Sequence, residues 1–160
     1  MSRPLHYILA PLFYFAVAWV GGFFTSQGVK SWYPTIAKPS YTPSGSFIGI
    51  VWTIIYILST ISLILFVNRA RGRAFFWPII GLYVLNGIFN TFWSYLFFVR
   101  HALGFAVLDA FLIWVTVEML ITFIWFYSRM ASLLLLPYFG WLTFAGYLTY
   151  VIYKTNSFSP

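Results

Sequence analysis

The sequence predicts an all-α membrane protein built as a bundle of five transmembrane helices. Of its 160 residues, 62% are hydrophobic and only 7% are charged, whereas a water-soluble domain has roughly a quarter charged residues. Two acidic residues in the whole chain cannot support a surface that water covers on all sides. We therefore expect a multi-pass integral membrane protein that forms one domain over residues 1–160.

Five apolar segments are long enough to cross the hydrocarbon core, which takes roughly 20 helical residues. They cover residues 7–24, 47–67, 74–99, 103–127 and 130–153. The links between the last four are short, which makes consecutive helices antiparallel neighbours in an up-and-down bundle. The one long connection is 25–46, where Pro39 and Pro43 favour extended or turn backbone. We expect this loop to fold over one end of the bundle.

The basic side chains divide between the two ends of this bundle. One end has Arg3, Arg69, Arg71, Arg73 and Arg129, and the other has Lys30, Lys38, Arg100 and Lys154. Because Lys and Arg are enriched in cytoplasmic loops, the tight Arg69–Arg73 cluster predicts an N-terminus inside the cell and the long loop outside. A bacterial cell membrane is a more natural setting for this arrangement than the outer membrane of an organelle.

Composition also excludes several functions. The chain has no cysteine, and its two histidines, His6 and His101, lie far apart without partners at metal-ligand spacing. We therefore expect no metal site, no thiol catalysis and no cofactor. The net charge of +7 suits anionic lipid head groups. No basic, water-exposed segment is long enough to bind nucleic acid.

Two carboxyl groups fall inside the fourth span. Asp109 and Glu118 are separated by about two and a half helical turns, so they face opposite sides and cannot form a catalytic pair. Asp109 shares a face with Ala106 and Ala110, small residues that let a neighbouring helix approach closely. We interpret Asp109 as hydrogen-bonded or protonated within the bundle. We interpret Glu118 as protonated or in contact with another subunit.

Amides and indoles within the spans outline a pocket. Asn86, Asn90 and Trp93 lie on one face of the third span, where an amide either bonds to a neighbouring helix or faces a ligand. The fifth span carries a similar stripe of Tyr138, Trp141, Ala145 and Leu148. Trp52 and Tyr56 share a face directly below the long loop. Together these positions predict a pocket for a flat, apolar ligand.

Five motifs in order and in register resemble those of a known family. They are "SWYPTIAKPSYTPSG", "VWTIIY", "FNTFWSYLFF", "FAVLDA" and "LLPYFGWLTFAGYLTY". The chain is similar over roughly residues 7 to 154 to the translocator protein family, also called the tryptophan-rich sensory protein or peripheral benzodiazepine receptor family. The resemblance implies a five-helix bundle, commonly dimeric, with a cavity beneath the first loop.

The resemblance also implies ligands and site residues. Family members bind porphyrins such as protoporphyrin IX, sterols, and benzodiazepine-type or isoquinoline carboxamide compounds. The matching ligand-binding positions here are Tyr33, Pro43, Trp52, Asn90, Trp93, Asp109, Trp141, Ala145 and Leu148. Ser44 stands where the family commonly has a second proline, which predicts a looser loop. The sterol-recognition pattern survives as Leu148, Tyr150 and Lys154, too weak a pattern to predict cholesterol binding.

Three hypotheses for function follow. The first is a membrane receptor, sensor or transporter that binds tetrapyrroles without an axial metal ligand. The second is light-dependent porphyrin breakdown, with electron transfer to or from Trp52 or Trp141, since the chain has no residues for ordinary catalysis. The third is a structural or regulatory membrane partner with a lipid site. In it, the stripe of Ala102, Ala106 and Ala110, together with Ala18 and Gly22 of the first span, makes helix–helix contacts.

Overall fold

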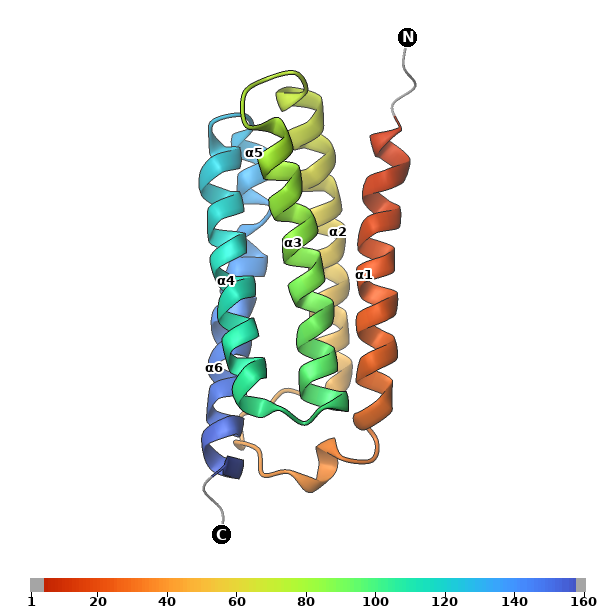
Figure 1. Cartoon of the computed structure of the whole chain (residues 1–160), viewed down its shortest axis with the longest axis vertical. Helices are drawn as coiled ribbons and strands as arrows, with labels where there is room; N and C mark the ends of the chain where they lie inside the picture. The colour runs from red at the N-terminus through yellow and green to blue at the C-terminus, as the bar shows by residue number, and fades with distance from the viewer. Residues whose placement is uncertain (1–4, 158–160) are drawn as a thin grey trace.

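The computed structural model describes residues 5–157, and within this range every regular element is helical. The elements are α1 (His6–Gly28), η1 (Tyr33–Thr35), α2 (Gly45–Ala70), α3 (Phe76–Ser94), the π-helical turn η2 (Tyr95–Val99), α4 (Leu103–Trp125), α5 (Arg129–Leu133) and α6 (Leu136–Ser157). Five stretches are long and apolar enough to span a membrane: α1, α2, α3 with η2, α4, and α5 with α6. The predicted bundle of five transmembrane helices is confirmed (Figure 1).

The helices run up and down, as the short links predict. Helix α3 packs against α1 and α4, and α4 also packs against α5 and α6. The loop between α1 and α2 crosses beneath the bundle, at the same end as the α3–α4 turn and the end of α6 (Figure 1). The arginines of the α2–α3 link lie at the opposite end, beside the start of α1. Arg3 of the predicted basic cluster lies outside the described residues.

Hydrogen bonds between helices hold the end of the bundle that is remote from the loop. The hydroxyl of Ser62 on α2 donates to the carbonyl of Ala131 on α5 at 2.7 Å and pairs with the Tyr83 hydroxyl of α3, also at 2.7 Å. All three residues are buried. In lipid, apolar surface does not drive helices together, so packing and such polar contacts do.

Ser44 has a structural role that the resemblance did not predict. It is the N-cap of α2, where its Oγ accepts the backbone N–H of Phe47 at 3.3 Å. A serine cap satisfies one of the free N–H groups at a helix start, which a proline side chain cannot do. Ser44 therefore fixes the point where the loop ends and α2 begins.

The end of α1 approaches the π-helical turn very closely. A Cβ atom added to Gly28 would lie 2.4 Å from the carbonyl oxygen of Phe98, a backbone atom that cannot move aside cheaply. The glycine therefore permits the contact that closes α1 against η2 at the loop end of the bundle.

We predict that Gly28→Ala lowers the free energy of unfolding by about 1–3 kcal/mol, because the new methyl group overpacks this contact. Thermal denaturation in detergent would measure the change. Gly81→Ala on α3 is the matched control, because a Cβ atom there meets nothing within 4 Å. Equal melting temperatures for the two variants would contradict the prediction.

Candidate ligand-binding site

A cavity of about 500 Å³ lies within the loop end of the bundle. This volume is typical of sites for drug-sized ligands and cofactors. All five spans and the loop contribute to its wall. The lining is mainly aromatic, aliphatic and small side chains, and none of the lining residues carries a charge.

Three tryptophans from three helices form flat surfaces around the cavity. The Trp52 ring stacks on Tyr56, with centroids 5.5 Å apart, and meets the edge of Tyr138 at 5.9 Å. The Trp93 ring stacks on Phe97 of the π-helical turn at 4.9 Å. Trp141 packs beside Phe144 at 5.5 Å. Each indole packs against a neighbouring ring, which restricts its movement and gives the cavity aromatic walls.

A chain of hydrogen bonds forms the inner boundary of the cavity. The Tyr56 hydroxyl donates to Asn90 Oδ1 at 2.8 Å, and Asn90 Nδ2 donates to the Tyr138 hydroxyl at 2.8 Å. The Tyr138 hydroxyl donates to Asn86 Oδ1 at 3.1 Å, and Asn86 Nδ2 donates to Thr116 Oγ1 at 2.9 Å. The sequence left two roles open for the third-span amides. Asn86 bonds between helices, whereas Asn90 does so and also lines the cavity.

Two indole N–H groups of the wall have no acceptor. Trp93 Nε1 and Trp141 Nε1 are buried, and neither has a hydrogen-bond partner among the described residues. By contrast, Trp114 Nε1 donates to Thr143 Oγ1 at 3.0 Å. A buried donor without an acceptor is costly, so these two N–H groups are unsatisfied positions beside the cavity.

An aromatic stack fixes the loop to the bundle, and a half-buried cation holds the loop together internally. The Trp32 ring stacks on His101 of the α3–α4 turn, with centroids 4.0 Å apart. Lys38 Nζ donates to the carbonyls of Tyr33 at 2.6 Å and Ile36 at 2.8 Å, and lies 4.6 Å from the centre of the Tyr33 ring. Partial burial raises the pKa of the Tyr33 phenol, so this lining hydroxyl stays protonated at neutral pH.

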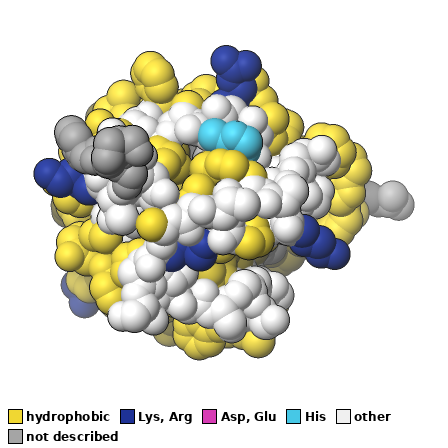
Figure 2. All heavy atoms as spheres, turned by 90° about the horizontal axis from the view of Figure 1, so that it is seen from below, with side chains coloured by type: hydrophobic (Ala, Val, Ile, Leu, Met, Phe, Trp, Pro, Cys, Tyr) yellow, Lys and Arg dark blue, Asp and Glu magenta, His cyan; other side chains and the backbone are white. Residues whose placement is uncertain are grey.

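An asparagine at the end of α6 holds the middle of the loop. Asn156 Oδ1 accepts the backbone N–H of Ala37 at 3.0 Å, and Asn156 Nδ2 donates to the Ala37 carbonyl at 2.9 Å. The side-chain amide thus pairs with both backbone groups of one loop residue. Figure 2 shows this end of the molecule, with Lys and Arg side chains at its rim and near its middle.

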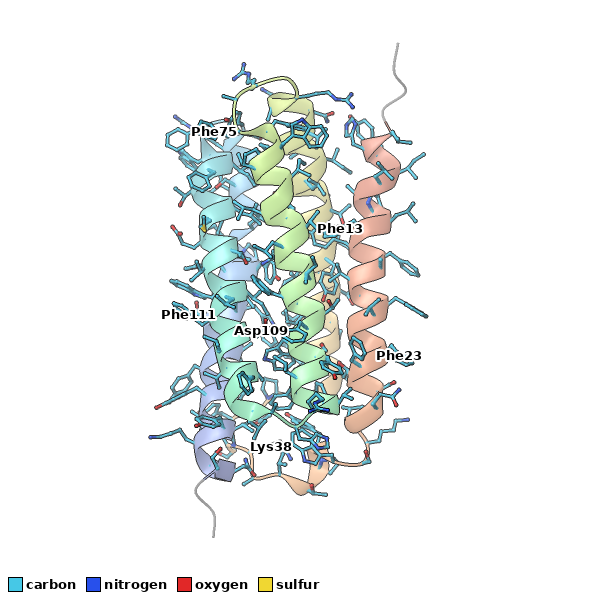
Figure 3. All side chains as sticks on the ribbon, viewed as in Figure 1. Phe13, Phe23, Lys38, Phe75, Asp109 and Phe111 are labelled. Carbon is cyan, nitrogen blue, oxygen red and sulfur yellow. The ribbon has the colours of Figure 1, made fainter. Side chains whose placement is uncertain are left out.

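The structure brings seven of the nine predicted site residues to the cavity wall. These are Tyr33, Trp52, Asn90, Trp93, Trp141, Ala145 and Leu148. Pro43 and Asp109 are not among the lining residues. Asp109 points into the bundle (Figure 3), is 3% exposed, and its Oδ2 has no partner among the described residues. Its neighbour Ala110 reaches the cavity instead, since adjacent helical residues point in different directions.

Sequence reasoning missed the wall that α1 supplies. Ala18, Gly21, Gly22, Thr25 and Ser26 line the cavity, and all have small side chains. Ala18 and Gly22 were expected to contact a neighbouring helix. Their i, i+3, i+4, i+7 spacing with Gly21 and Thr25 is the signal for a face of small residues. Nothing in the sequence distinguishes a face that admits a helix from one that leaves room for a ligand.

The fold and the cavity define a polytopic membrane protein with an aromatic internal pocket. Comparison with known proteins is consistent with this class, because the TspO/MBR family matches residues 9–154. The chain belongs to this family. It is 37% identical over 147 residues to the tryptophan-rich protein TspO of Archaeoglobus fulgidus, covering 89% of this chain and 91% of the relative.

Two further relatives show how widely the similarity extends. The tryptophan-rich protein TspO of Bacillus cereus is 38% identical over 128 residues, which cover 79% of this chain and 82% of that protein. The human translocator protein is 29% identical over 136 residues, which cover 84% of this chain and 79% of that protein. The resemblance seen in the sequence motifs is thus confirmed.

We predict that Asn156→Leu releases the loop from α6, because it removes both hydrogen bonds to Ala37, each worth about 0.5–1.5 kcal/mol. Hydrogen exchange of the Ala37 amide would measure the loss of protection. Asn68→Leu is the matched control, since Asn68 bonds to His6 and Tyr7 at the opposite end of the bundle. Equal exchange in the two variants would argue against the Asn156 contact.

Proposed function

We propose that the chain is a membrane receptor, sensor or transporter that binds flat polycyclic ligands of the tetrapyrrole class, such as protoporphyrin IX. The observation that carries this proposal is an uncharged cavity of about 500 Å³ with three tryptophans in its wall. Trp93 and Trp141 also have unpaired indole N–H groups. A planar π-system stacks on indole faces, and acceptor atoms on the ligand satisfy the N–H groups. Compounds of the benzodiazepine and isoquinoline carboxamide types also combine planar π-systems with acceptor atoms, so the proposal includes them as ligands.

A cation at the loop end of the cavity favours a ligand with acidic groups. The Lys38 ammonium is half-buried beside Tyr33, which lines the cavity, and its two carbonyl contacts use two of its three N–H donors. A propionate at the loop end pairs with this cation without entering the apolar interior. The described lining residues include no His, Met or Cys, so their chemistry suits a metal-free porphyrin better than haem.

We predict that Ala145→Thr weakens protoporphyrin IX binding by about 1–3 kcal/mol, because added volume in the wall overpacks the bound ligand. Quenching of tryptophan fluorescence in detergent or nanodiscs would give the dissociation constant. Ala16→Thr makes the same substitution on an exposed position of α1 that does not line the cavity, and should leave binding unchanged.

Two results would count against the proposal. Equal affinity in the Ala145→Thr and Ala16→Thr variants would place the ligand outside this cavity. A protein that co-purifies with lipid and shows no quenching by porphyrin would favour the third hypothesis, a structural membrane partner whose cavity is a lipid site.

Light-dependent porphyrin breakdown is a second candidate, favoured by the position of two indoles. Trp52 and Trp141 come from different helices and both line the cavity, so a stacked porphyrin would lie in contact with both. In this reaction the photoexcited porphyrin exchanges an electron with an indole, and dissolved oxygen is the final oxidant. The stack of Trp52 on Tyr56 at 5.5 Å gives the resulting charge a neighbouring ring to move to.

For this second candidate we predict that Trp141→Phe slows the bleaching of bound protoporphyrin IX under illumination by at least severalfold. Absorbance at the porphyrin band, followed with ligand fully bound, would measure the rate. Trp114→Phe is the control, because Trp114 bonds to Thr143 and does not line the cavity. Equal rates in the parent, both variants and empty detergent would rule out a role for the Trp141 indole.

A further inference from the structure

The cavity reaches the outer surface of the bundle between α1 and α2. The lining residues that are exposed all lie on these two helices: Gly22 and Ser26 on α1, and Gly45, Gly49 and Thr53 on α2. The described lining residues of the loop and of the other helices are buried or half-buried. The cavity therefore opens sideways between these five residues, and we call this gap the α1–α2 opening.

The α1–α2 opening lies at the depth of the hydrocarbon. Gly22 precedes the end of α1 at Gly28 by six residues, and Thr53 follows the start of α2 at Gly45 by eight. At 1.5 Å per residue, these positions are about 9 Å and 12 Å from the helix ends on the loop side. Helices of this length exceed a hydrocarbon core of about 30 Å by only a few ångströms at each end. The opening therefore meets the bilayer interior, whereas its upper edge at Ser26 meets the head groups.

Glycines leave the opening unfilled. A Cβ atom added to Gly22, Gly45 or Gly49 would meet nothing within 4 Å. Farther from the loop the two helices close against each other, where the Tyr14 ring of α1 lies 6.1 Å from the Tyr56 ring of α2. Tyr14 is buried, and Tyr56 also lines the cavity. The gap between α1 and α2 is thus confined to the cavity.

A hydroxyl group without a partner lies inside the opening. Ser94 on α3 lines the cavity and is 8% exposed, and its hydroxyl has no hydrogen-bond partner among the described residues. It faces α1, because a Cβ atom added to Gly21 would lie 3.6 Å from Ser94 Oγ. A hydroxyl both donates and accepts, so Ser94 is a polar contact point for a molecule that passes α1.

We propose that flat ligands enter and leave the cavity from the bilayer, through the α1–α2 opening, so that the site takes molecules that dissolve in the membrane. This inference rests on the proposed function, because it concerns the route to the same cavity. A tetrapyrrole suits the route, since its ring dissolves in hydrocarbon while its propionates stay among the head groups. The opening extends up to Ser26 and Gly45, so the ring moves in sideways and its acidic edge stays at the level of the loop.

Entry from water through the loop would break more contacts. The Trp32–His101 stack and the two bonds between Asn156 and Ala37 hold the loop across the end of the bundle. A ligand that came through the loop would have to displace them. Among residues 5–157, no side-chain hydrogen bond joins residues 18–28 of α1 to residues 45–56 of α2. Passage between α1 and α2 therefore leaves the hydrogen bonds of the bundle intact.

Side chains that fill the opening test the route. Gly22→Leu and Gly49→Leu each add a side chain where a Cβ atom meets nothing. In nanodiscs of the full chain, stopped-flow quenching of tryptophan fluorescence by protoporphyrin IX would give the association rate. We expect each variant to slow association by about tenfold, because the ring must pass an added side chain. Dissociation into excess protein-free vesicles should slow as well, since a ligand leaves by the route through which it enters.

Gly140→Leu on α6 is the matched control and should keep the parent rates. Gly140 is exposed, a Cβ atom there also meets nothing, and it does not line the cavity. Asn156→Leu tests the other route, because it releases the loop. Entry from the bilayer predicts an unchanged association rate in this variant, and entry through the loop predicts a faster one. Equal melting temperatures would show that all variants fold.

Three results would overturn the proposal. The first is an association rate that neither glycine variant changes. The second is faster dissociation with unchanged association in these variants, which would make Gly22 and Gly49 parts of the wall only. The third is faster association in Asn156→Leu. Absence of quenching in the parent is a different failure, because it contradicts the proposed function itself and the route with it.

Discussion

The bundle depends on hydrogen bonding that is completed without water. Lipid offers no donors or acceptors, so a polar side chain within the spans is satisfied only by a partner in the protein. A continuous chain of hydrogen bonds runs from Tyr56 through Asn90, Tyr138 and Asn86 to Thr116. It joins the side chains of α2, α3, α6 and α4. These contacts fix the separation of four helices, and this separation keeps the loop end of the bundle open as a cavity.

Some buried polar atoms of the bundle have no hydrogen-bond partner among the described residues. The Trp93 and Trp141 N–H groups are among them. Asp109 Oδ2 is also buried without a partner, behind the cavity wall. In a hydrocarbon surrounding an unsatisfied polar atom is costly, so these positions weaken the hydrogen bonding of the bundle.

Much of this arrangement could be predicted from particular residues. Apolar length alone predicted five spans, and the i, i+4, i+7 spacing of Asn86, Asn90 and Trp93 predicted one polar face of α3. Motif similarity predicted seven residues of the cavity wall, from the loop, α2, α3 and α6. It did not predict that Pro43 and Asp109 lie off the wall, because a motif identifies a position and not the direction of its side chain. It also did not predict the cap at Ser44, which depends on where α2 begins.

The sequence by itself determined the class of protein and the number of its spans, because both follow from apolar length and the scarcity of charge. Only the tertiary structure decided which helix faces line the cavity and which pack against another helix. Small residues on α1 and α4 look alike in sequence, yet Ala18 lines the cavity whereas Ala106 is completely buried in the packed core. Whether a small residue admits a helix or leaves room for a ligand depends on how far apart the helices are held. That distance is set by contacts between residues far apart in the chain, such as Gly28 with Phe98 and Tyr56 with Asn90.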